Sequence, residues 1–141
     1  MIALRVSGEL ACSAERAWAL VADYGQDPRW RAGVTTMNPQ PPGIVTPGTT
    51  TEEVLRFGGR TYRSGGLVTS VDPGREFSWR TTSGLRASGG RILEPLDDRR
   101  TRLTLHAQVR PPGILRLFEP VLTPLLRRQL LADIGRLTRL V

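Results

Sequence analysis

The chain has 141 residues, of which 39% are hydrophobic and 23% are charged, and this composition excludes an intrinsically disordered protein. Its formal net charge is +7, yet all 20 basic residues are arginines, spread from Arg5 to Arg139 with no run longer than two. Nucleic-acid-binding proteins gather their basic residues in a tract or stripe, so we expect a solvated basic surface and no nucleic-acid partner.

The first segment alternates apolar and polar residues from Ile2 to Cys12, which predicts a strand with one wet face. It carries Glu9 and polar residues, so it lacks a signal-peptide core, and no stretch of the chain reaches the roughly 18 apolar residues of a membrane span. The lone Cys12 excludes an internal disulfide and suits a reducing compartment. We therefore expect a cytoplasmic protein without integral membrane contact, folded as a single domain over residues 1–141.

Two short helices are predicted after this strand. Ser13 is a typical N-cap, and the helix that it begins ends before Gly25 and Pro28. A short second turn follows over Asp27–Ala32. Apolar residues recur in the first helix at helical spacing, namely Ala17, Trp18, Val21 and Ala22.

The middle of the chain is divided by Gly, Pro and Asp turn signals into runs of strand length, without helical periodicity. This pattern predicts an antiparallel meander and, with the first strand, seven strands in all. The six predicted strands are Thr35–Asn38, Thr49–Phe57, Arg60–Asp72, Glu76–Thr82, Arg86–Leu96 and Arg100–Val109.

A long amphipathic helix is predicted from Pro112 onward. Because Pro120 and Pro124 each remove an internal hydrogen bond, we expect a kink or a short first helix, with the main helix capped by Thr123 and beginning at Pro124. The helical stripe expected to close the core consists of Ile114, Leu117, Phe118, Val121, Leu122, Leu125 and Leu126.

This order of elements predicts an α+β helix-grip fold, in which a curved seven-stranded antiparallel sheet wraps around the C-terminal helix. The stretches SAERAWALVADYGQDPRWRAGV, VDPGREFSWRTTSG and PPGILRLFEPVLTPLLRRQLLADIGRLTRL resemble the polyketide cyclase/dehydrase-like branch of the START and birch-pollen-allergen superfamily, known as SRPBCC. The resemblance covers nearly the whole chain. It implies a mostly apolar cavity between the sheet and the last helix.

Strand phase indicates which side chains face that cavity. Glu53 shares one phase with Thr51, Leu55 and Phe57, whereas the alternative phase contains Glu52, and a one-residue bulge would exchange the two. We favour the first phase because it carries the large apolar residues. A buried Glu53 could act as a general acid or base, or bind a ligand hydroxyl.

Other predicted wall residues have an ordinary core role as the alternative. Trp18 is expected to pack the first helix on the sheet, and Trp30 to lie near the cavity mouth, as a hydrophobic plug or as a ligand-facing wall. Tyr62, Ser64 or Arg80 would orient a ligand. The candidate ligand-binding residues are Trp30, Glu53, Leu55, Phe57, Tyr62, Ser64, Trp79, Leu105, Phe118 and Leu122.

Catalytic motifs are scarce. His106, the only histidine, falls in the opposite phase from Leu105 and is expected to be exposed and inert. One histidine and one cysteine cannot build a metal cluster, and no glycine-rich phosphate loop or nucleophile elbow is present. We expect no metal and no cofactor, and Glu53 and Tyr62 are the only weak catalytic candidates.

Three functions remain open at this stage. The first is a carrier that binds a hydrophobic small molecule, such as a lipid or an aromatic metabolite. The second is an enzyme similar to polyketide aromatase/cyclases, in which the cavity folds a poly-β-ketone chain for aldol closure and dehydration. The third is a membrane-surface or protein-partner module that uses the C-terminal helix. The sequence leaves both a monomer and a homodimer open.

Overall fold

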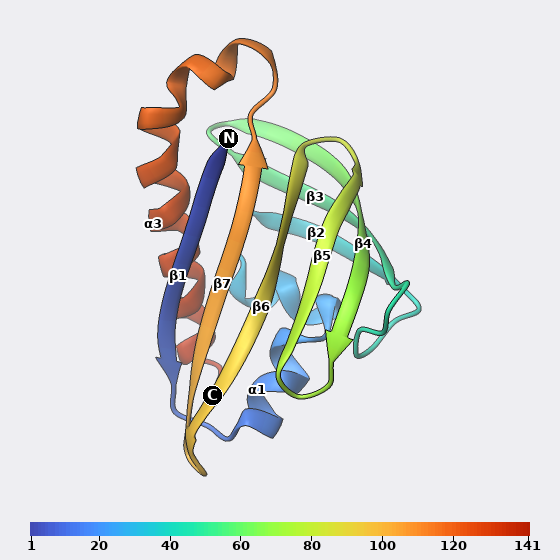
Figure 1. Ribbon diagram of the computed structural model, residues 1–141, viewed down its shortest axis with the longest axis vertical. Helices are drawn as coiled ribbons and strands as arrows, with labels where there is room; N and C mark the ends of the chain where they lie inside the picture. The colour runs from blue at the N-terminus through green and yellow to red at the C-terminus, as the bar shows by residue number, and fades with distance from the viewer.

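The computed structural model describes residues 1–141 and contains one antiparallel sheet with the strand order β1-β7-β6-β5-β4-β3-β2. Only the β1–β7 pair joins strands that are distant in sequence, and it closes the meander against the N-terminus (Figure 1). The strands are β1 (Ile2–Leu10), β2 (Val34–Gln40), β3 (Thr50–Phe57), β4 (Arg60–Asp72), β5 (Glu76–Ser83), β6 (Arg86–Asp97) and β7 (Arg100–Arg110).

The helices lie in two groups. The short elements after β1 lie under the middle of the sheet, and the long helix runs alongside β1 (Figure 1). They are α1 (Ala14–Val21), the 3-10 turn η1 (Tyr24–Gln26), α2 (Asp27–Trp30), the 3-10 turn η2 (Gly113–Phe118) and α3 (Glu119–Thr138). The α+β helix-grip prediction is therefore confirmed, and each predicted strand lies within two residues of an observed one at either end.

The sheet is strongly curved. Register shifts interrupt the ladders between β2 and β3, between β4 and β5, and between β6 and β7. Each bulge adds local twist, so the sheet bends around α3 and leaves a concave face.

Two apolar clusters hold the helices on the sheet. One joins β1, β6 and β7 to α1 and α3 and includes Leu10, Leu103 and Leu137, each fully buried. The other lies under β4 and β5 around Val68 and Phe77. Trp18 contacts both clusters, and its ring meets Phe77 edge to face at 6.1 Å, so it packs α1 on the sheet as predicted.

The start of the long helix differs from the prediction. It begins at Glu119, with Pro120 in the first turn, and Pro124 lies inside it. Thr123 does not cap the helix, because its hydroxyl donates to the carbonyl of Glu119 one turn earlier at 2.8 Å. Pro124 is the sixth residue of the helix and has no N–H, so the carbonyl of Pro120 lacks its intrahelical partner near the start of α3.

The predicted apolar stripe is wrong for five of its seven members. The side chains that face the sheet are Leu115, Leu122, Leu126 and Leu130. The segment is apolar on two faces, so spacing alone did not identify the inner one. Exposed instead are Ile114 (71%), Leu117 (77%), Phe118 (51%), Val121 (59%) and Leu125 (45%).

None of the helices is both long enough and apolar enough to cross a membrane.

Candidate functional site

A cavity of about 240 Å³ lies between the concave face of the sheet and α3. The β5–β6 turn and η2 lie at the same end of the molecule (Figure 1). The residues that line the cavity at this end, among them Leu85 and Leu115, are partly exposed. Buried residues line the opposite end, where Tyr24 and Trp30 close it under the sheet. The cavity is therefore a one-ended pocket with an apolar mouth.

Nine of the ten predicted wall residues line this cavity. The phase favoured for β3 is correct, because Glu53, Leu55 and Phe57 face inward whereas Glu52 is exposed. Tyr62 and Ser64 follow on β4, and they pair across the ladder with Leu55 and Glu53. The nine are Trp30, Glu53, Leu55, Phe57, Tyr62, Ser64, Trp79, Leu105 and Leu122.

Phe118 is the exception. It ends η2 on the side away from the sheet and lies outside the cavity wall, half exposed. Leu115, earlier in η2, lines the cavity in its stead. Arg80 is likewise exposed and does not line the cavity.

Trp30 lies at the inner end of the cavity and not near the mouth. Its side chain is 0% exposed and packs in the cluster of β1, β7 and α3. It therefore fills the core and also lines the inner end of the cavity. Its indole Nε1 is buried without a hydrogen-bond partner.

A buried ion pair supports the inner end. Asp27, 0% exposed, accepts two hydrogen bonds from Arg91, at 2.9 Å on Oδ1 and 2.6 Å on Oδ2. Arg91 also donates to the carbonyl of Val21 at 2.9 Å, which ties β6 to the end of α1. Two parallel bonds between a guanidinium and a carboxylate fix both groups in plane. Asp27 thus holds α2 against the middle of β6.

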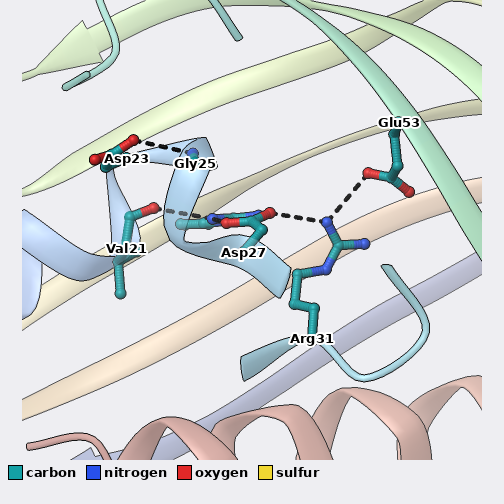
Figure 2. Close-up of polar contacts among 7 residues, drawn as sticks. Val21, Asp23, Gly25, Asp27, Arg31 and Glu53 are labelled. Atoms are coloured by element: carbon teal, nitrogen blue, oxygen red, sulfur yellow. Dashed lines mark hydrogen bonds and ion pairs between the residues drawn. The ribbon is translucent and has the colours of Figure 1, made fainter. Parts of the chain in front are cut away.

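Arg31 extends this pair to the cavity surface. Its Nη1 donates to Asp27 Oδ2 at 3.0 Å and to Glu53 Oε2 at 3.1 Å, so one nitrogen bridges α2 and β3 (Figure 2). Burial opposes the charged form of Arg31, but the carboxylates of Glu53 and Asp27 outweigh it and raise the pKa of the guanidinium. Glu53 is consequently an ion-paired carboxylate at the cavity wall and not an isolated buried acid.

Aromatic rings surround the guanidinium of Arg91. It lies 4.8 Å from the ring centroid of Tyr24 and 4.9 Å from that of Trp30, within cation–π range. Burial raises the pKa of Tyr24 to about 12, although the nearby Arg91 opposes the shift. The Tyr24 hydroxyl is therefore a neutral hydrogen-bonding group at the inner end of the cavity.

Asp133 brings a carboxylate from α3 to the same end. It is buried and accepts a hydrogen bond from Arg136 at 2.8 Å. Burial raises its pKa, whereas Arg31 and the backbone N–H of Ala32 lower it.

His106 lies in the phase opposite to Leu105, as expected, but it is half-buried. Its imidazole covers Gly90, where an added Cβ would lie 2.6 Å from Nε2. Burial and then Arg5 lower its pKa, so the ring is neutral at pH 7. No group of three or more His, Cys, Asp and Glu side chains is placed to hold a metal ion.

Sequence reasoning missed the residues that organise this end: Tyr24, Asp27, Arg31 and Arg91. One signal was available, because Arg91 shares its strand phase with the buried Leu93, and an arginine on an apolar face requires an acidic partner. The partner, Asp27, lies 64 residues away and could not be identified by spacing.

Comparisons with known proteins agree with this architecture. The model of the family described as polyketide cyclase / dehydrase and lipid transport matches residues 1–141. No protein with a curated description is significantly similar in sequence.

Solved structures share the fold. The aromatase/cyclase ZhuI from Streptomyces sp. R1128 is 16% identical and has a TM-score of 0.80, with 96% of this chain and 90% of that chain covered. A START superfamily protein from Mycobacterium smegmatis is 16% identical, with a TM-score of 0.75 and 99% of each chain covered. A protein from Thermus thermophilus is 15% identical, with a TM-score of 0.82 and coverage of 97% of this chain and 94% of that chain.

Proposed function

Because the chain belongs to the polyketide cyclase / dehydrase and lipid transport family, we propose that it binds a hydrophobic small molecule in the cavity between the sheet and α3. The observation that carries the proposal is a preformed pocket, apolar at its mouth and polar at its closed end. Ligand sites have this combination of apolar lining and a few convergent polar groups.

The size of the cavity limits the ligand. Its volume of about 240 Å³ lies below the roughly 300 Å³ at which typical ligand pockets begin. The bound molecule is therefore small, or part of it protrudes through the mouth beside Leu85 and Leu115. An apolar molecule that loses about 300 Å² of surface to the wall gains roughly 7 kcal/mol before the costs of association.

Native mass spectrometry of gently purified protein tests the proposal, with a denatured sample beside it to identify any released molecule. A defined extra mass that disappears on denaturation supports binding. The variant Ala87→Phe fills the wall near the mouth and should lose that mass, whereas Gln108→Phe, on an exposed position of β7, should keep it. An empty protein that also ignores hydrophobic fluorophores contradicts the proposal.

A cyclase-type enzyme is the second candidate, and one observation favours it. Glu53 and Tyr62 are diagonal neighbours on the cavity face of the β3–β4 pair, so a carboxylate and a phenol approach one bound chain together. A positioned base and donor can direct enolisation and aldol closure. Glu53→Gln and Tyr62→Phe should each lower turnover of a linear poly-β-ketone mimic. If neither does, these roles are wrong.

A further inference from the structure

Every charged residue of the cavity wall has an ion-pair partner. Four of them line the cavity: Arg31, Arg91, Glu53 and Asp133. Both arginines bind Asp27, and Arg31 also binds Glu53. Asp133 is paired with Arg136 on the next turn of α3. Three arginines thus face three carboxylates, and no cationic charge is left over.

Histidine does not change this balance. His106 is the remaining basic residue in the cavity lining; its imidazole lies over Gly90 in the opposite strand phase from Leu105, where burial lowers its pKa and keeps the ring uncharged at pH 7. A bound anion would therefore bring an uncompensated negative charge next to Glu53 and Asp133. Burying an unpaired charge is far more costly than burying a neutral polar group.

Hydrogen-bonding capacity remains at the same place. Arg31 uses only Nη1 in its contacts, which leaves N–H groups on Nε and Nη2. Tyr24 also lines the cavity, and its hydroxyl makes no hydrogen bond within the protein. A ketone, phenol or alcohol oxygen can accept from these donors without adding charge.

We infer that the inner end of the cavity binds a neutral oxygen-bearing group, and that the pocket rejects carboxylates of the same size. The inference rests on the proposed function, since it concerns the ligand of the same cavity. It selects neutral ketones, phenols or alcohols with an apolar body over fatty acids and aromatic acids.

The test compares two ligands that differ in charge. The neutral fluorophore N-phenyl-1-naphthylamine first reports cavity occupancy, and Ala87→Phe checks that it binds there. It is then displaced at pH 7.4 with 2-acetylnaphthalene, a neutral ketone, or with 2-naphthoate, the carboxylate of similar size. We expect the ketone to compete at least about tenfold more strongly than the carboxylate.

Two variants that remove the same charge test whether ion pairing at the cavity wall, and not the shape of the cavity, causes the rejection of carboxylates. Glu53→Gln leaves one arginine charge uncompensated at the cavity wall, so it should strengthen 2-naphthoate binding by about tenfold and change ketone binding little. Glu52→Gln removes the same charge on the exposed face of β3 and should leave both affinities unchanged.

The outcomes are distinguishable. If the fluorophore does not bind wild-type protein, the proposed function fails. If it binds but both ligands displace it equally, if the carboxylate is stronger, or if the ketone does not compete, the inference is overturned while the proposed function stands. Because the wild-type comparison needs no variant, it holds even if Glu53→Gln fails to fold.

Discussion

At the scale of single residues, Asp27 connects the fold to the site. Its two oxygens receive three hydrogen bonds from two arginines, and no water reaches it. A buried ion pair such as Asp27–Arg91 need not stabilise the fold more than apolar residues of similar size at the same positions would. Removal of one partner, however, leaves the other charge buried without compensation. The arrangement therefore fixes where α2 and Arg31 lie relative to the cavity.

Asp27→Asn should lower the free energy of unfolding by about 3 to 5 kcal/mol, since Arg91 would stay buried without a counter-charge. Chemical denaturation measures this loss. Asp98→Asn, at an exposed turn residue, serves as the control and should change stability by less than about 0.5 kcal/mol. Equal stability of the two variants would mean that the pair is not the anchor described here.

Tyr24 gives a pH dependence. Its folded pKa of about 12 exceeds the ordinary 10.0, so the fold favours the neutral phenol. This contribution to stability is complete below pH 10 and is lost as the pH rises toward 12. An ultraviolet titration of wild type minus Tyr24→Phe isolates this group from Tyr62, the only other tyrosine. A difference curve centred near pH 10 would contradict the assigned burial.

At the scale of elements, the strands could be predicted from sequence and the long helix only in part. Turn residues and alternation are local signals, so Arg60–Asp72 was predicted with its observed bounds. The first part of α3 is apolar on two faces, and only tertiary packing decides which of them meets the sheet. Seven of the nine wall residues lie on strands and followed from strand phase, but the ion network did not, because Asp27 and Arg91 resemble surface residues in sequence.

The two faces of α3 should respond differently to substitution. Leu137 is fully buried, so Leu137→Ala should lower the free energy of unfolding by about 2 to 5 kcal/mol. Leu125 is 45% exposed, and Leu125→Gln should change it by less than about 0.5 kcal/mol. Denaturant melts of both variants measure the difference. A large loss in Leu125→Gln would mean that the outer face is covered in solution.

At the scale of the whole molecule, the architecture separates support from binding. The buried clusters and the Asp27 network hold the short helices at the closed end, whereas the apolar mouth is built from the β5–β6 turn and η2. The wall is preformed, so a ligand that fits it need not order the chain, and its binding energy adds to the stability of the folded state.

A ligand of this cavity should therefore raise the melting temperature in a concentration-dependent way. At a free concentration of 100 times Kd the stabilisation is about 2.7 kcal/mol, because the ligand binds the folded and not the unfolded chain. For a domain of this size that is a shift of roughly 6 to 12 °C. Differential scanning fluorimetry with 2-acetylnaphthalene should show it in wild type and in Gln108→Phe. Ala87→Phe should melt at the same temperature with and without the ketone, since its side chain occupies the space. A shift that survives in Ala87→Phe would place the binding site on another surface of the protein.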